Sequence, residues 1–366
     1  MVGAQLTISL EIISHCNGLN MTRASDNIDF VKEVDEIAEK AIDAFGLSYD
    51  KTAPENLHNP LLRWCDFILR YIPNATRYVY KSDKFPAFIP KEAEKGLKRI
   101  EELFIAGGDV NPYQSKSLTL FNDTSSKKKN KRTDMLWADW GIHHLHLHLP
   151  CNAVAPTEQY SERSEWILFL RVYNDVVLFI DVKNHNKGIE PELFSQQELI
   201  KTFIRNWPEE AGLYEMKGVI GLARDEPLTD SGIGTMRRNG INIPIEVNGK
   251  VYAPLGMGVT TAATSARVSS YHNRIYRYAR DLENIVIDEK NEFMKEIKEL
   301  SINRPDFKIM MFDDGGLGIY EEMLKKAWRF PRKHSQTPNN LYCLFNDLLM
   351  PEWAGPVVAS YWRNNP

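Results

Sequence analysis

Two apolar runs on either side of one short polar turn constrain the fold of this chain most strongly. The first run, ILFLRVY, covers residues 167–173, and the second, VVLFIDVKNH, covers residues 176–185. Both are rich in β-branched and aromatic residues. With Asn174–Asp175 between them, they predict two strands joined by a tight turn. Because VVLFI is apolar on both faces, we expect the second strand to be central in its sheet.

A histidine-rich segment precedes this predicted hairpin. From Trp137 onward the pattern changes to β, and WGIHHLHLHL at residues 140–149 settles into alternation at period two. On a strand, His144, His146 and His148 share one face, and His143 shares the other with the leucines at 145, 147 and 149. We expect the leucine face to lie in the core. The three imidazoles should then face a cavity, solvent or another element.

The regions on either side of these strands are predicted to be largely helical. Apolar residues recur at near-helical spacing in residues 25–45, 59–71, 90–106 and 196–207, and residues 266–300 predict one long charged helix. Asn248–Gly249 within residues 245–253 and the DDGG turn within residues 308–320 predict two further hairpins.

These patterns together indicate an α+β fold. We expect a mainly helical N-terminal region at residues 1–133 and a helical C-terminal region at residues 266–366. Between them, residues 134–265 should form an α+β core. That core would have a central antiparallel or mixed sheet that carries the histidine-rich strand.

Composition limits the possible partners and location. The formal net charge of −4 provides no global basic field, so a polyanion site must be a local patch. The four widely spaced cysteines form no CxxC pair, which is typical of free thiols in a reducing cytoplasm. No apolar run approaches the roughly 18 residues of a membrane span, and Glu11 interrupts the apolar start. We therefore expect a cytoplasmic protein without a signal peptide, and either Met1 or Met21 as its start.

The histidines suggest acid–base chemistry. Side chains at i and i+2 on a strand project in parallel, and imidazole titrates near neutral pH. In the DVKNH sequence, Asp181, Lys183 and His185 also share one face. Candidate catalytic residues are therefore His144, His146, Asp181, Lys183 and His185. A half-exposed polar strand face would carry the same residue types for packing reasons alone.

A metal site is an alternative use of the same residues. Two strand histidines can chelate a divalent ion such as zinc or manganese when a third ligand is present. Asp181 and His185 are candidates for that third ligand. The alternative ligand set is therefore His144, His146, His148 and Asp181, whereas the leading interpretation needs no cofactor.

Two further segments suggest phosphate binding. GMGVTTAATS at residues 256–265 leads into a predicted helix, whose free backbone N–H groups can bind an anion. Neither a Walker A nor a Rossmann motif is present, and a tight turn with a Ser or Thr cap is the simpler explanation of the segment. The KKKNKR run at residues 127–132 is either a solvated charge run or a loop that holds a phosphate backbone. The candidate substrate-binding residues are Thr260, Thr261, Ser265, Arg267, Lys127, Lys128 and Lys129.

Residues 139–265 resemble a set of uncharacterised bacterial proteins. The similarity rests on WGIHHLHL, on ILFLRVYNDVVLFIDVKNH and on the downstream RRNGINIPIEVNGKVYAPLGMGVTTAATS. The segment is also loosely similar to small α+β ribonucleases of toxin and phage-defence systems. Those proteins place His, Lys or Arg, and Ser or Thr on a curved sheet. The similarity to the ribonucleases is at the level of the fold, and it assigns no residue roles.

The leading hypothesis is a metal-independent ribonuclease, or a related enzyme that acts on phosphodiesters. His144 and His146 would act as acid and base. Lys183, Arg267 or the 260–265 loop would stabilise developing charge, and the lysine run would hold the RNA backbone. The alternatives are a metal-dependent hydrolase and a non-catalytic binding or regulatory module. The sequence does not predict the oligomeric state.

Overall fold

The computed structural model describes most of the chain. The described residues are 28–54, 57–114, 116–148, 165–186, 188, 192–219, 221, 228–302, 305–332 and 340–365. The expectations about the start of the chain, Cys16, Cys151 and Leu149 concern residues outside these ranges.

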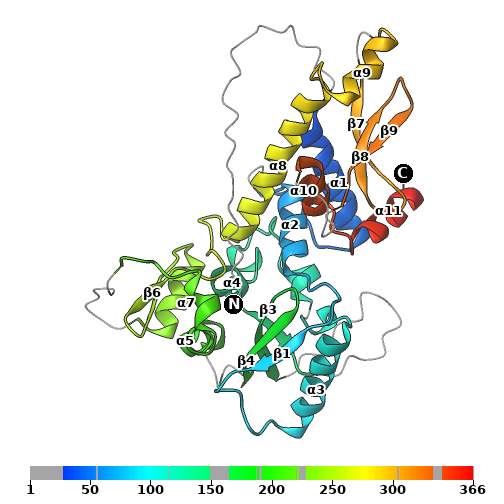
Figure 1. Ribbon diagram of the computed structural model, residues 1–366. Coiled ribbons are helices and arrows are strands. Elements are labelled where there is room, and N and C mark those ends of the chain that lie inside the picture. The colour runs from blue at the N-terminus through cyan, green and yellow to red at the C-terminus, as the bar shows by residue number, and fades with distance from the viewer. Residues whose placement is uncertain are drawn as a thin grey trace, which may run out of the picture.

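A four-stranded mixed sheet lies at the centre of the fold (Figure 1). Its strand order is β1-β4-β3-β2, and the strands are β1 (Tyr78–Lys81), β4 (Val176–Asn184), β3 (Trp166–Val172) and β2 (His143–His146). β1 runs parallel to β4, whereas the other two pairings are antiparallel. The predicted hairpin and the central position of its second strand are both confirmed. β1 comes from the region that the sequence predicts to be mainly helical.

A β-bulge in β4 determines which side chains share the face of the histidines. Phe169 pairs with Asp181, but the next residue, Leu170, pairs with Phe179, so Ile180 is an extra residue on β4. A bulge reverses the alternation of the strand beyond it. Ile180 therefore packs with Phe169, and Asp181 follows it on the same side of the sheet.

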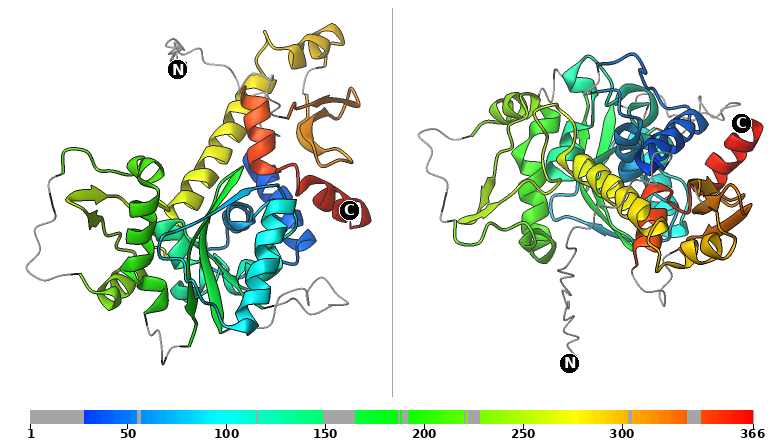
Figure 2. Two further views of the ribbon diagram at one scale, coloured as in Figure 1. Left: turned by 60° about the horizontal axis from the view of Figure 1, so that its bottom comes forward. Right: turned by 90° about the horizontal axis from the view of Figure 1, so that it is seen from above.

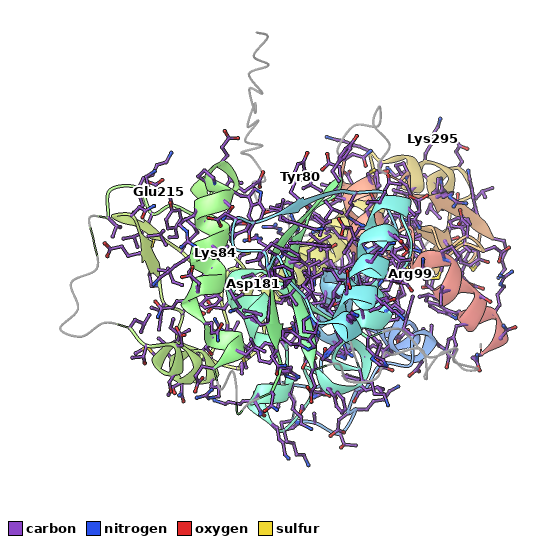
Figure 3. The ribbon with its side chains drawn as sticks, turned by 90° about the horizontal axis from the view of Figure 1, so that it is seen from below. Tyr80, Lys84, Arg99, Asp181, Glu215 and Lys295 are labelled. Carbon is purple, nitrogen blue, oxygen red and sulfur yellow. The ribbon has the colours of Figure 1, made fainter. Side chains whose placement is uncertain are left out.

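Helices cover both faces of this sheet. Helix α3 (Lys91–Ala106) packs on the face that contains Leu145 and Leu168, and α5 (Gln197–Asn206) packs on the face that contains Ile167. Figure 3 shows Asp181 in the sheet layer, between α3, which carries Arg99, and the helices on the other side. The leucine face is buried, as predicted, because Leu145 and Leu147 have no exposed surface.

Shorter elements extend the layer around α5. They are η5 (Leu193–Ser195), α6 (Pro208–Gly212), α7 (Asp230–Arg238), β5 (Ile245–Val247) and β6 (Lys250–Tyr252). The β5–β6 pair forms the hairpin predicted at Asn248–Gly249, and both turn residues have positive φ angles. This layer and the sheet share one hydrophobic core.

The N-terminal and C-terminal regions share a second core. It contains the helices α1 (Phe30–Ala44), α2 (Pro60–Arg70), α8 (Ala266–Val286), α9 (Glu292–Glu299), α10 (Leu341–Leu349) and α11 (Gly355–Asn364). It also contains an antiparallel sheet of β7 (Phe307–Met311), β8 (Leu317–Glu321) and β9 (Lys326–Arg329). Figure 2 shows α8 running between the layer around α5 and this C-terminal part.

The α+β class is confirmed, but two local predictions are wrong. Residues 266–300 form two helices, because an Asp288–Asn291 turn separates α8 from α9. The β pattern begins at His143, since helix α4 (Met135–Trp140) occupies the segment before it and ends at Gly141, whose φ is 68°. The remaining short elements are η1 (Asn111–Gln114), η2 (Ser117–Phe121) and η3 (Lys129–Lys131). In the part of the chain that the structure describes, no helix is long and apolar enough to cross a membrane.

Candidate functional site

Strand register places the candidate catalytic residues in two rows across the sheet. His144 pairs with Phe169, which pairs with Asp181. His146 pairs with Ile167, which in turn pairs with Lys183. Because paired residues of neighbouring strands point to the same side, all four polar side chains share one face. The β4 bulge is necessary for this arrangement, since it turns Asp181 and Lys183 toward the histidines.

Three imidazoles lie next to one another on this face, and one phenylalanine packs against two of them. The ring centroids of His144 and His146 are 6.1 Å apart, and those of His146 and His185 are 5.9 Å apart. Phe194 of η5 lies 5.2 Å from the ring of His144 and 5.5 Å from that of His185. We call His144, His146 and His185 the histidine cluster. His146 is buried, whereas the other two are half-buried, so the cluster is partly open.

Asp134 supplies a carboxylate to this cluster. Its Oδ2 lies 3.2 Å from Nδ1 of His144, and its Oδ1 caps α4 by accepting from the N–H groups of Leu136 and Trp137. Burial alone would raise the pKa of the Asp134 carboxyl. The His144 imidazole, the Arg70 guanidinium and the capping N–H of Trp137 outweigh burial and hold this pKa well below its ordinary value. Asp134 is therefore an anion at neutral pH.

An ion pair lies across the sheet from the histidines. Nζ of Lys183 is 3.2 Å from Oδ2 of Asp181, and both side chains are mostly covered. The other carboxylate oxygen of Asp181 accepts from the N–H of Val182. The predicted candidates His144, His146, His185, Asp181 and Lys183 thus share one face of one sheet.

His143 lies on the opposite face and has a different environment. It is buried, and its ring packs edge-on to Trp137 at a centroid distance of 6.2 Å. Burial lowers the pKa of His143 to about 3, and the positive charges of Arg70 and Arg267 act in the same direction. This imidazole is therefore neutral at pH 7 and belongs to the core.

The residues of the alternative metal set are only partly brought together. His148 lies half-buried, two residues beyond the end of β2. Among the described residues, no group of three or more His, Cys, Asp or Glu side chains is placed to hold a metal ion. The metal-dependent alternative remains a prediction that needs its own measurement.

The threonine and serine residues mainly stabilise their own turn. Ser265 is fully buried, and its hydroxyl caps α8 by accepting from the N–H of Val268. The hydroxyls of Thr260 and Thr264 lie 2.8 Å apart, whereas Thr261 is exposed. Thr260 and Arg267 also line a cleft of about 830 Å³ beside α8, and none of the described residues that line it belongs to the histidine cluster.

The lysine run lies next to this turn. Lys127, Lys128 and Lys129 are all exposed. The loop is tied down by Arg132, whose guanidinium donates to the carbonyl oxygen of Ser126 at 2.8 Å and to that of Ala262 at 2.6 Å. The two segments with predicted phosphate-binding residues are therefore neighbours in space.

Two residues of the site were missed by the sequence-based prediction. Phe194 has no sequence signal, because its role depends on how η5 packs on the sheet. Asp134 could have been found, since an aspartate directly before an apolar helical segment is a typical N-cap. The helix that Asp134 caps was not recognised, because the sequence analysis assigned a β pattern from Trp137 onward.

Comparisons with known proteins give no relative from which a function could be transferred. No family model, curated protein or solved structure matches this chain. The similarity to toxin and phage-defence ribonucleases therefore remains a prediction, and any proposed function depends on the geometry of the site.

Proposed function

We propose that the protein is a metal-independent ribonuclease, or a closely related enzyme that cleaves phosphodiesters by histidine acid–base catalysis. The observation that carries this proposal is the Asp134–His144 pair within a cluster of three imidazoles. A carboxylate 3.2 Å from one imidazole nitrogen fixes the orientation of the ring. A lone surface histidine lacks such a carboxylate.

The residues divide into roles that match cleavage through the RNA 2′-hydroxyl. Because Asp134 faces Nδ1 of His144, Nε2 is the nitrogen left for substrate, where it would take the proton of the 2′-hydroxyl. The 2′-oxygen would then attack phosphorus as the bond to the 5′-oxygen breaks, and His146 or His185 would protonate the leaving oxygen. Lys183 would stabilise the negative charge that develops on the phosphoryl oxygens. The products would be a 2′,3′-cyclic phosphate and a 5′-hydroxyl.

The test is cleavage of a labelled mixed-sequence RNA by the full chain in excess EDTA. Native protein, His144→Ala and His58→Ala are compared, because His58 is also half-buried but lies outside the histidine cluster. We expect the native protein and His58→Ala to cleave RNA, and His144→Ala to lose at least about a hundredfold in rate. DNA of the same sequence should remain intact, because it lacks the 2′-hydroxyl.

Other outcomes distinguish the competing functions. Cleavage that appears only after zinc or manganese is added would favour the metal-dependent hydrolase and overturn the proposal. Cleavage that His144→Ala retains would remove the histidine cluster from the site. Absence of cleavage with or without metal would favour a binding or regulatory module.

A further inference from the structure

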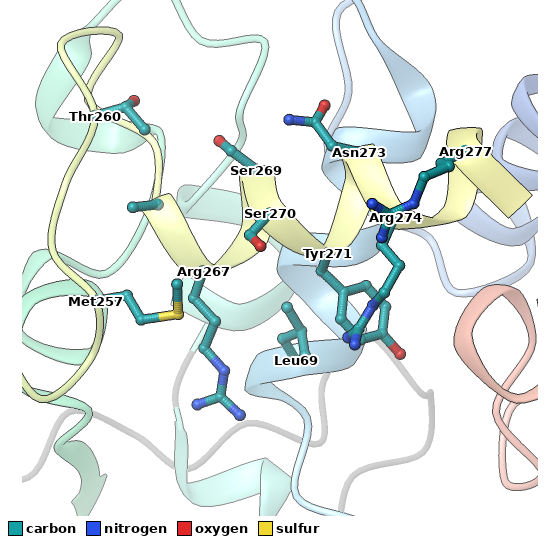
Figure 4. A pocket seen from close by; sticks show the side chains of 11 residues that line it. Leu69, Met257, Thr260, Arg267, Ser269, Ser270, Tyr271, Asn273, Arg274 and Arg277 are labelled. Atoms are coloured by element: carbon teal, nitrogen blue, oxygen red, sulfur yellow. The ribbon is translucent and has the colours of Figure 1, made fainter. Parts of the chain in front are cut away.

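The cleft beside α8 is lined by an unusual concentration of positive charge. Three arginines of this helix line it: Arg267, Arg274 and Arg277 (Figure 4). Hydroxyl and amide groups of Ser269, Ser270 and Asn273 lie among them, and all of these side chains come from one helix. No aspartate or glutamate is among the described residues that line the cleft. Its volume of about 830 Å³ is within the range of sites that bind small molecules or short polymer segments.

Within the part of the chain that the structure describes, no carboxylate neutralises the charge of these arginines. Among the described residues, none of the three forms an ion pair with a carboxylate. Arg267 and Arg274 instead lie over aromatic rings, at 5.7 Å from the centroid of Trp137 and 5.4 Å from that of Tyr271. The charge of Asp347 adds to burial in raising the pKa of the cleft residue Tyr271. This carboxylate has its own partner, because its Oδ1 lies 3.7 Å from Nη1 of Arg332. The cleft is therefore a site of net positive potential in a protein whose formal net charge is −4.

The spacing of the arginines fits a linear polyanion. With a rise of about 1.5 Å per residue, Arg267 and Arg277 are about 15 Å apart along the helix axis, with Arg274 between them. At the N-terminal end of the helix, Thr260 lines the cleft and the Arg132–Ala262 hydrogen bond holds the lysine run nearby. The lysine run is thus held near one end of the cleft, and the arginines alone span a greater length than one phosphate group needs.

We propose that this cleft binds the phosphate backbone of single-stranded RNA, outside the histidine cluster. A duplex presents its phosphates on a wide convex surface, which a cleft of this size does not admit, whereas a single strand fits along it. The serine and asparagine side chains supply donors for sugar hydroxyls and base edges. The identification of the ligand as RNA rests on the proposed function. The cleft extends that function, because it would hold the strand at a distance from the bond that is cleaved.

The test measures binding separately from cleavage. The probe is a fluorescently labelled single-stranded RNA of about 12 nucleotides, with anisotropy as the readout. All proteins carry His144→Ala so that the probe stays intact. Arg274→Glu is compared with Arg280→Glu, because Arg280 is exposed on the same helix but does not line the cleft. We expect Arg274→Glu to weaken binding at least about tenfold and Arg280→Glu to change it less than about twofold. Loss of one phosphate contact should also lower the salt dependence, the slope of log K against log salt, by about 0.7.

Each outcome decides for or against the cleft. Equal weakening by the two substitutions would show that only total charge matters and would overturn the proposal. Tighter binding of a duplex of the same sequence would overturn the commitment to a single strand. If the native protein cleaves RNA but Arg274→Glu binds the probe normally, the cleft fails and the proposed function stands. If the cleft variant alone loses binding but the native protein cleaves nothing, the cleft stands and the proposed function fails.

Discussion

The carboxylate of Asp134 lies 3.2 Å from Nδ1 of His144 and also caps the first turn of α4. One side chain therefore fixes both where the helix begins and how the imidazole on the adjacent strand is oriented. Because the pKa of this carboxyl is held well below its ordinary value, the stability it contributes is present at neutral pH. That contribution is lost only as the pH falls through the lowered pKa in strong acid.

Replacing Asp134 with asparagine separates these two roles. The amide oxygen of the introduced side chain can still accept from the first turn of α4, so the helix cap is retained, but the negative charge beside His144 is lost. We expect Asp134→Asn to lower the rate of RNA cleavage about a hundredfold or more while the protein stays folded. The measurement is single-turnover cleavage, with circular dichroism to monitor the fold.

Asp134→Ala is the companion variant, because it removes the cap as well as the charge. It should lose a further ~1 kcal/mol of unfolding free energy compared with Asp134→Asn. An Asp134→Asn protein that cleaves RNA at the native rate would contradict the role assigned to this carboxylate.

Buried His143 should make the protein sensitive to mild acid. Its pKa is lowered to about 3 in the folded protein, whereas an unfolded histidine titrates near 6.5. Between these two values the unfolded chain binds the additional proton, so native stability falls as the pH decreases through this window. For one titrating group, the free energy of unfolding changes by at most about 1.4 kcal/mol per pH unit.

The matching experiment is denaturant unfolding of the native protein and His143→Gln from pH 4 to pH 8. The stability advantage of the native protein should be largest above pH 7 and should shrink as the pH is lowered. Parallel stability curves for the two proteins would mean that His143 titrates normally.

The sequence predicted those parts of the fold that depend on local pattern. The α+β class and the hairpin around Asn174–Asp175 follow from strand periodicity and turn chemistry, and both are present. The leucine face of β2 follows from the same rule. β1 was not predicted, because a short edge strand with exposed tyrosines at 78 and 80 has little apolar pattern and is defined by its pairing with β4.

The candidate site was predictable only in part, for a related reason. The sequence places His144 and His146 on one face, but it does not reveal the bulge at Ile180 that brings Asp181 to the same face. That bulge depends on pairing with β3. The helix at residues 135–140 was not predicted either, because a six-residue helix has too few turns for its periodicity to be recognised in the sequence.

Glu33 lies between the N-terminal helix and the C-terminal sheet. It should give a pH dependence of stability whose sign is opposite to that of His143. Its Oε2 accepts from the N–H of Ile309 at 2.6 Å. Burial, assisted by the charges of Glu36 and Asp306, raises the pKa of this carboxyl from 4.5 to about 7. The folded protein therefore binds the additional proton between these values, and native stability falls as the pH rises through them.

Glu33→Gln removes this titration but keeps an oxygen that can accept from Ile309. We expect the variant to be more stable than the native protein at pH 8 by roughly 1–3 kcal/mol, and equally stable near pH 4.5. Denaturant unfolding at the two pH values measures the difference. A variant that is less stable at pH 8 would show that the carboxylate form is favoured by Lys308 and the Ile309 N–H more than it is penalised by burial.

Two glycines with similar φ angles should respond very differently to alanine. Gly315, in the turn between β7 and β8, has a φ of 80°, and Gly249, in the β5–β6 turn, has a φ of 75°. A Cβ atom on Gly315 would overlap the backbone of Gly355 at the start of α11, whereas one on Gly249 would meet nothing within 4 Å.

Gly249→Ala therefore tests the left-handed backbone conformation alone and should cost about 1 kcal/mol. Gly315→Ala adds a backbone clash and should cost ~3 kcal/mol or more, since α11 must move away from the turn. Thermal unfolding of both variants measures the difference, and equal losses would contradict the close contact between Gly315 and Gly355.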